Sequence, residues 1–182
     1  GAQVDELMVW DEEFASTGQE VVAARESALA AVSPVAASYY QELADGRGDA
    51  TLVYERSWEG DLRDALKSEL RRDVQRGYST IGPHRDDMSI QLDGRDARRQ
   101  ASQGEQRSLA LALLLAGDSL VRDRRRISPL LMLDDVFSEL DPIRSTRLLA
   151  LLPSGQTLVT AAAPLPTDLL PAVVVDVTKE TL

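Results

Sequence analysis

Apolar residues recur near helical spacing along the first 43 residues, and this pattern predicts a helix over residues 4–43. The positions that carry it are Leu7, Phe14, Val21, Val22, Leu29 and Val32. Ser33-Pro34 interrupts the series. Because serine is a preferred N-cap and proline is favoured in the first helical turn, this pair predicts a break and a second helix over residues 34–44.

The next 57 residues combine strand and helix patterns. After a turn at residues 45–49, β-favouring residues predict a strand over 51–56. A stripe of leucines predicts an amphipathic helix over 61–76, which Gly77 is suited to end. Alternating residues from 88, followed by Asp93-Gly94, predict a hairpin with a type I′ turn and a second strand over 95–100.

From residue 100 onward, strand and helix patterns alternate, and this order predicts an α/β fold. Residues 105–121 are apolar almost all round, which is typical of a buried helix. The fully apolar strand over 130–133 is typical of a parallel sheet covered on both faces. A helix over 142–152 and two further strands, over 157–160 and 173–177, complete the pattern.

Composition excludes several classes of site. The 182 residues carry a net charge of −10, which argues against an electrostatic grip on nucleic acid by the whole domain. The chain has no cysteine and one histidine, so disulfides, thiolate sites and multi-histidine zinc sites are excluded. No apolar run is long enough for a membrane span, and a cytoplasmic location is expected. The first residues lack both Met and a signal-peptide pattern, which is typical of a processed or cut end.

Ser102-Gln103-Gly104-Glu105 opens the helix predicted from residue 105 and allows two interpretations. Ser-x-x-Glu is a capping box, which is a common structural device. The same geometry also suits phosphate binding. A helix N-terminus offers unpaired N–H groups and partial positive charge, glycine permits a close approach, and the serine hydroxyl adds a donor. The motif alone does not decide between the two.

Asp134 and Asp135 follow an apolar strand of the predicted parallel sheet. Ligands bind such sheets at the carboxyl ends of their strands. Since consecutive side chains of a strand point in opposite directions, one acid could face Mg²⁺ and the other an attacking water. In the structural alternative one of them caps a turn, just as Asp141-Pro142 has the pattern of a helix start.

The order of these segments resembles the signature motif, Walker B strand and D-loop of ABC-type ATPase heads. The residues within these segments resemble those of the RecF family of DNA replication and repair proteins even more closely. The segments that carry this likeness are Gly82-Pro83-His84-Arg85-Asp86-Asp87, Ala101-Ser102-Gln103-Gly104-Glu105-Gln106-Arg107 and Leu133-Asp134-Asp135-Val136-Phe137-Ser138-Glu139-Leu140-Asp141. The resemblance implies the C-terminal part of such a head, with a helical arm segment over residues 1–78 and the half-head over 79–182.

The resemblance also implies roles for individual residues. Two heads would sandwich two ATP molecules, with Mg²⁺, in a homodimer. Ser102, Gln103, Gly104 and Glu105 would contact the nucleotide held by the partner, and Ser138 and Asp141 would form the D-loop. Asp134 would hold Mg²⁺ through water. Asp135 would be the catalytic residue and would take the place of the usual glutamate that orients or activates the attacking water. The complete protein would bind double-stranded DNA near single-strand gaps, at the nucleoid, and act with RecR and RecO.

One motif that the resemblance requires is absent. A P-loop needs Gly-Lys, and none of the 11 glycines precedes a lysine. In the resembled family this loop lies in the N-terminal half, so the chain alone is expected not to hydrolyse ATP. Where many ABC heads carry a switch histidine, the chain has Ala161-Ala162-Ala163, and Thr160 is the only polar candidate nearby for γ-phosphate sensing.

Further expectations concern DNA and rival functions. Arg95, Arg98 and Arg99 are candidate DNA contacts because few acids lie near them in the sequence. His84 with its adjacent acids more often marks a turn held by salt bridges than a metal site. A non-hydrolysing binding module is one alternative function. A phosphohydrolase that gathers metals with Asp86, Asp87, Asp134 and Asp135 is another.

Overall fold

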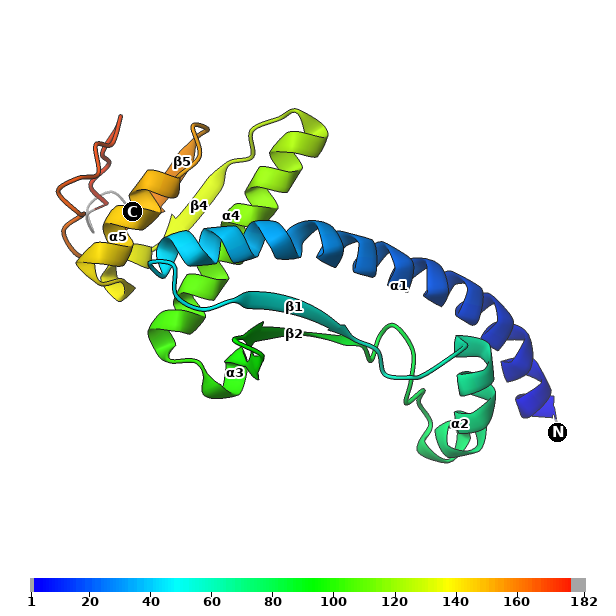
Figure 1. Cartoon of the computed structure of the whole chain (residues 1–182). Helices are drawn as coiled ribbons and strands as arrows, with labels where there is room; N and C mark the ends of the chain where they lie inside the picture. Colours follow the sequence, from blue (N-terminus) through cyan, green and yellow to red (C-terminus); the bar gives the residue numbers. More distant parts are fainter. Residues whose placement is uncertain (1, 178–182) are drawn as a thin grey trace.

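The computed structural model describes the backbone of residues 2–177 and the side chains of residues 10–177. Its elements, in chain order, are α1 (Ala2–Leu43), β1 (Ala50–Glu55), α2 (Leu62–Arg76), β2 (Asp87–Leu92), β3 (Arg95–Asp96), α3 (Ala97–Gln100), α4 (Gln103–Arg125), β4 (Leu131–Asp134), the 3₁₀ turn η1 (Val136–Glu139), α5 (Pro142–Leu151) and β5 (Thr157–Thr160). Helix α1 runs alongside β1 and β2 and joins α2 at one end to the group of α4, α5, β4 and β5 at the other (Figure 1).

Helix α1 continues through Pro34, so the predicted break at Ser33-Pro34 is wrong. Proline removes one backbone donor from a helix, but the Pro34 ring is exposed and displaces no packed side chain. Ser33 does not cap a helix. Its hydroxyl accepts a hydrogen bond from the Leu52 backbone N–H at 3.3 Å and thereby ties α1 to β1. Although α1 is long, none of the helices in the described part of the chain is apolar enough to cross a membrane.

The hairpin is confirmed at its turn and corrected in its second strand. β1 pairs with β2 in antiparallel register, and β2 pairs with β3. Asp93 and Gly94 both have positive φ, of 51° and 72°, as a type I′ turn requires. The strand expected over 95–100 ends at Asp96, because the Asp96 carboxylate accepts a hydrogen bond from the Arg98 N–H and caps the short helix α3.

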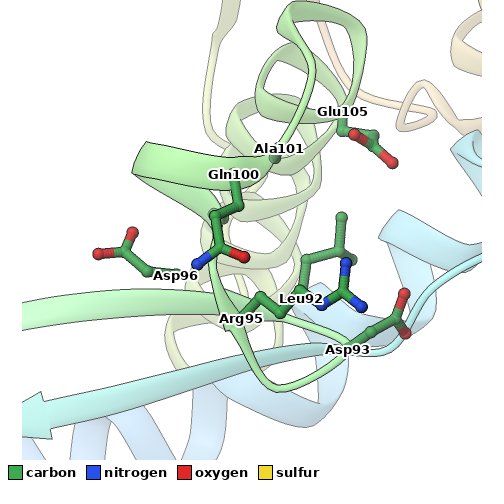
Figure 2. A pocket seen from close by; sticks show the side chains of 8 residues that line it. Leu92, Asp93, Arg95, Asp96, Gln100, Ala101 and Glu105 are labelled. Carbon is green, nitrogen blue, oxygen red and sulfur yellow. The ribbon is translucent and has the colours of Figure 1, made fainter.

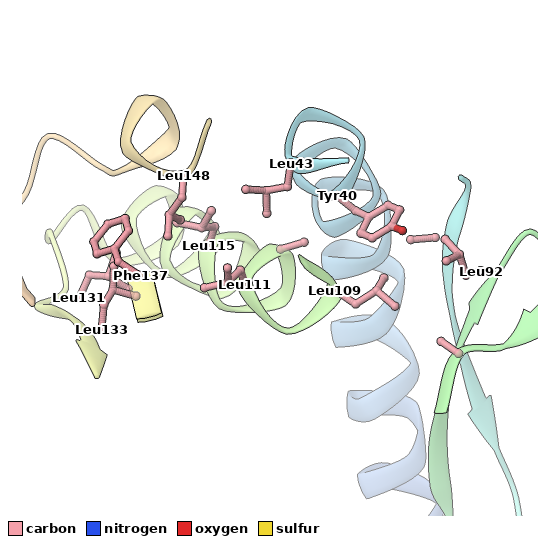
Figure 3. Close-up of a cluster of buried hydrophobic side chains, with 13 residues drawn as sticks. Tyr40, Leu43, Leu92, Leu109, Leu111, Leu115, Leu131, Leu133, Phe137 and Leu148 are labelled. Atoms are coloured by element: carbon pink, nitrogen blue, oxygen red, sulfur yellow. The ribbon is translucent and has the colours of Figure 1, made fainter. Parts of the chain in front are cut away.

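The main core lies between α4, the C-terminal end of α1 and the parallel strands (Figure 3). Its fully buried large side chains include Tyr40, Leu43, Leu115 and Leu148. A second cluster joins α1 to α2 through Ala15, Val22, Trp58, Leu62, Leu66 and Ile81. Helix α4 is not buried all round as predicted. Leu114 and Val121 are each 43% exposed, because α1 and the sheet cover only part of its surface.

The α/β part contains the parallel pair β4–β5, in which Asp134 lies opposite Thr160. Only one face of this pair is covered, contrary to the prediction: Leu133 is 3% exposed, whereas its neighbour Met132 is 64% exposed. The strand predicted over 173–177 is also wrong. Its valines are exposed, and without a neighbouring strand their backbone forms no ladder within the described residues.

Candidate functional site

The two acids lie at the carboxyl end of β4, beside the end of β5. The Thr160 hydroxyl donates a hydrogen bond to Asp134 Oδ1. The Asp135 backbone N–H is shared between the carbonyl oxygen and the hydroxyl oxygen of Thr160, each at 3.1 Å. The predicted strand end is therefore confirmed, and Thr160 belongs to the same site.

Asp135 lies just outside β4 and has a left-handed backbone, with φ 46° and ψ 26°. The alternation of a pleated strand therefore does not set the direction of its side chain, and the assignment of one acid to Mg²⁺ and the other to the attacking water stays a prediction. The Ser138 hydroxyl donates to Asp135 Oδ2 at 2.9 Å, and the Ala162 N–H donates to Oδ1 at 3.2 Å. The contact from Ala162 had no signal in the sequence, because it comes from a backbone amide 27 residues away.

The donor set at this edge fits Mg²⁺ held together with a phosphate ligand. Asp134 is exposed, and Thr160 makes the one hydrogen bond to its carboxylate within the described residues, to Oδ1. Within residues 10–177, no three His, Cys, Asp or Glu side chains gather as a metal cage. Mg²⁺ commonly takes one or two carboxylates and completes its shell with water and phosphate oxygens. The Asp134 carboxylate, which is exposed to solvent at the end of β4, fits this coordination preference.

The capping box at the head of α4 is confirmed. Ser102 Oγ accepts from the Glu105 N–H at 3.4 Å, and Glu105 Oε2 accepts from the Ser102 N–H at 2.7 Å. The Ser102 hydroxyl also lies 2.7 Å from the same carboxylate oxygen. These bonds hold the pKa of Glu105 below its ordinary value, with the hydroxyl contact as the largest cause. Gln103 is exposed in the first turn.

Part of the predicted D-loop segment lies beside this helix start. Asp141 caps α5 by accepting from the Arg144 N–H at 2.9 Å, which is the largest cause of its lowered pKa. The Arg144 guanidinium packs on Gly104, where an added Cβ would lie 3.2 Å from Nη1. Arg107 of α4 pairs with Glu139 at 3.0 Å. The structure thus brings the predicted signature and D-loop segments together.

We expect Glu105→Gln to lower the free energy of unfolding by about 0.5 kcal/mol at pH 7, since a partly exposed charge at a helix N-terminus contributes modestly. The folded pKa of Glu105 lies below its unfolded value, so this contribution is complete above the unfolded pKa, near 4.3, and is lost as pH falls through the folded pKa. Urea unfolding between pH 7 and 3 measures it. A difference between the two proteins that stays constant with pH would contradict the assignment.

The turn that contains His84 and Asp86 is a structural junction. Asp86 accepts hydrogen bonds from the Ser57 N–H at 2.8 Å and from the Tyr54 hydroxyl at 2.5 Å. His84 packs edge-on against Phe14, with ring centroids 5.9 Å apart. Hydrogen bonds, rather than the expected salt bridges, hold Asp86 in place. The pKa of Tyr54 is raised above its ordinary value, mainly by burial and in second place by the hydrogen bond to Asp86. Sequence reasoning missed Tyr54 and Ser57, which are about 30 residues distant.

This arrangement speaks against the phosphohydrolase alternative. The carboxylate of Asp86 is engaged by β1 and the loop after it, and Asp87 is exposed at the start of β2. In the part of the chain with described side chains, no group of three potential metal ligands brings them to Asp134 and Asp135. The four acids do not form one metal site.

Of the three candidate DNA-binding arginines, Arg95 lines a small pocket of about 170 Å³ beside the start of α4 (Figure 2). Arg95 and Asp93 line it from the hairpin turn, and Glu105 lines it from α4. Arg98 and Arg99 are exposed on α3, and Arg99 lies 3.6 Å from Asp96. Their accessibility suits a phosphate backbone, and DNA contact stays a prediction.

Known proteins resemble the chain over most of its length. DNA replication and repair protein RecF of Lachnoclostridium phytofermentans is 37% identical over 158 residues, which cover 86% of this chain and 44% of that protein. RecF of Symbiobacterium thermophilum is 40% identical over 161 residues, which cover 82% and 43%. RecF of Streptomyces avermitilis is 41% identical over 167 residues, which cover 86% and 44%. No family model matches the chain.

Solved structures of RecF also resemble this chain. The recombination mediator protein RecF with ATP, in the RecFOR pathway, matches with a TM-score of 0.76 and 25% identity over 91% of this chain and 46% of that chain. The RecF-ATPrS structure matches with a TM-score of 0.74 and 26% identity, over 87% and 46%. The chain spans less than half the length of the curated relatives above. It therefore belongs with RecF and corresponds to the C-terminal part of that protein.

Proposed function

We propose that this chain is the C-terminal portion of an ATP-dependent DNA-binding protein that acts in recombinational repair and gap processing. One observation carries the proposal: α4 begins with a capped Ser-x-Gly-Glu turn that contacts Arg144 after the Asp141 cap, and β4 ends in Asp134, which Asp135 follows. A serine hydroxyl and the backbone donors of a helix start suit a phosphate, and an acid at a strand end suits its Mg²⁺. RecF structures with ATP support the choice of nucleotide.

In the complete head, catalysis would consist of positioning and charge neutralisation. Asp134 would hold Mg²⁺ through water, and the ion would neutralise charge on the phosphate oxygens. Asp135 would orient the attacking water and accept its proton. The Gly104 backbone N–H would donate to the γ-phosphate bound by a second subunit. The Ser102 hydroxyl would also donate to it once it turns away from Glu105 Oε2, which accepts its proton in this structure. Asp141 would contact across that dimer.

The P-loop would come from the protein's own N-terminal half. The open face of β4 and β5 supports this pairing, since Met132 is 64% and Leu158 50% exposed on adjacent strands. The valines over 173–177 are exposed as well and lie outside the strands of the described residues. Soluble domains seldom leave such apolar surface uncovered, so a second layer of sheet and helix is expected there.

The remaining assignments follow the same proposal. Residues 1–78 would form the arm segment and residues 79–182 the half-head. Arg95, Arg98 and Arg99 would contact double-stranded DNA near gaps, with the protein located at the nucleoid. RecR and RecO would be its partners, which is consistent with relatives assigned to the RecFOR pathway.

Joining this chain to its N-terminal half tests the proposal. We expect the isolated chain to release no phosphate from ATP, because it has no P-loop lysine. The joined protein should hydrolyse ATP slowly with Mg²⁺ and dimerise when ATP is present. Phosphate release and light scattering measure both results, and turnover by the isolated chain that is lost in Asp135→Asn would contradict the proposal.

The alternative is an ABC-like module that binds without hydrolysis. It is favoured by the Asp135 carboxylate, which already accepts hydrogen bonds from Ser138 and Ala162. ATP-dependent dimerisation and DNA binding without phosphate release, in the joined protein, would support this alternative.

A further inference from the structure

The last residue of β5 and the segment that follows it contact both acids at the end of β4. Thr160 donates to Asp134 Oδ1 and also accepts from the Asp135 N–H. Two residues later, the Ala162 N–H donates to Asp135 Oδ1 at 3.2 Å. Parallel pairing sets this arrangement, because it places Thr160 directly opposite Asp134.

We propose that Thr160 is a positioning residue for Mg²⁺-dependent ATP hydrolysis, an inference that rests on the function proposed above. Its hydroxyl fixes the rotamer of Asp134 by holding Oδ1, so that Oδ2 is left for a water bound to Mg²⁺. Groups that hydrogen-bond a metal ligand from behind orient it and tune its basicity. The same hydroxyl accepts a hydrogen bond from the backbone N–H of Asp135, the residue with the left-handed backbone.

A direct contact from Thr160 to the γ-phosphate is the competing role. A threonine hydroxyl carries one proton and therefore donates one hydrogen bond at a time. In Thr160 this proton is directed to a carboxylate, and a hydrogen bond to an ionised acceptor is stronger than a neutral one. The hydroxyl thus has no donor left for a phosphate oxygen, which favours positioning over sensing.

Three variants of the protein joined to its N-terminal half test the role. Thr160→Val removes the hydroxyl and keeps the shape, and Thr160→Ser restores the hydroxyl. Thr157→Val is the matched control, because Thr157 stands at the other end of β5 and its buried hydroxyl oxygen has no hydrogen-bond partner within the described residues.

We expect Thr160→Val to lower kcat about tenfold and to raise the half-saturating Mg²⁺ concentration by a similar factor, with KM for ATP changed less than about twofold. Thr160→Ser and Thr157→Val should match the unsubstituted protein. A raised KM for ATP with unchanged Mg²⁺ dependence would overturn the proposal in favour of phosphate contact. Equal defects in Thr160→Val and Thr160→Ser would also overturn it.

Hydrogen exchange separates this inference from the proposed function. The Asp135 amide should exchange several-fold faster in Thr160→Val than in Thr160→Ser, whether or not ATP is hydrolysed, since one of its two acceptors is lost. A joined protein that hydrolyses no ATP would refute the proposed function. Unchanged exchange of the Asp135 amide in Thr160→Val would refute the positioning role.

Discussion

Replacing Asp135 by Asn should lower the kcat for ATP hydrolysis by the joined protein by at least about a hundredfold, because the proton acceptor for the attacking water is lost. Folding should hardly change. Asn adopts the left-handed backbone of this position at least as readily as Asp does. Its amide oxygen can still accept from the Ala162 N–H, and its amide nitrogen can face the Ser138 hydroxyl.

Phosphate release, ATP affinity and urea unfolding should be measured together for this variant. Asp93→Asn is the matched control, since Asp93 also has a left-handed backbone, with φ 51°, but lies in the hairpin turn. We expect its kcat to stay within about twofold of the unsubstituted protein. If Asp135→Asn loses stability or ATP affinity as strongly as kcat, Asp135 is a structural residue and another group activates the water.

Local sequence motifs were sufficient to predict the structure where the contacts that determine it join residues close together in the sequence. Gly77 ends α2 in the left-handed conformation, as expected, and Asp61, where the helix was predicted to begin, caps α2 by accepting from the N–H groups of Arg63 and Asp64. The capping box of Ser102 with Glu105 and the Asp93-Gly94 turn are likewise contained within four residues. Such motifs contain both of the residues that interact, so the identity of these residues is enough to predict them.

Predictions failed where a distant partner decides the structure. Ser33 has the composition of a cap, but its hydroxyl accepts from Leu52 in another element, and α1 continues. The valines over 173–177 have strand character, yet a strand forms only beside a partner backbone. At the candidate site the acids were predictable from their position after an apolar strand. The contacts from Thr160 and Ala162 were not, because parallel pairing brings them together across about 26 residues.

The turn from Gly82 to Asp87 illustrates how a motif shared with a family can serve the fold. Arg25 of α1 donates to the Pro83 carbonyl oxygen at 2.5 Å, and Ser57 exchanges hydrogen bonds with Gly82. Three segments far apart in sequence therefore meet at this turn. These contacts indicate that the turn holds α1, β1 and the loop after β1 together, a role that needs no chemistry of its own.

Asp86→Ala should therefore lower the free energy of unfolding by about 2–3 kcal/mol. The substitution leaves the Ser57 N–H and the Tyr54 hydroxyl without their acceptor in a half-buried site, and each unsatisfied group costs about 1–3 kcal/mol when fully buried. Asp87→Ala is the matched control. Its carboxylate is exposed and, among the residues that the structure describes, accepts only from the Met88 N–H, so a change within about 0.5 kcal/mol is expected.

Urea unfolding of both variants measures the difference, and titration of the Tyr54 absorbance adds an independent readout. The bond to Asp86 helps to raise the pKa of Tyr54, so Asp86→Ala should lower that pKa towards its ordinary value while Asp87→Ala leaves it in place. If the turn is a structural junction, Asp86→Ala lowers the free energy of unfolding, and ATP turnover falls only because less of the protein is folded. If Asp86→Ala abolishes turnover in the joined protein at full stability, the turn takes part in the reaction, and its hydrogen bonds to Ser57 and Tyr54 then position a functional group rather than the fold.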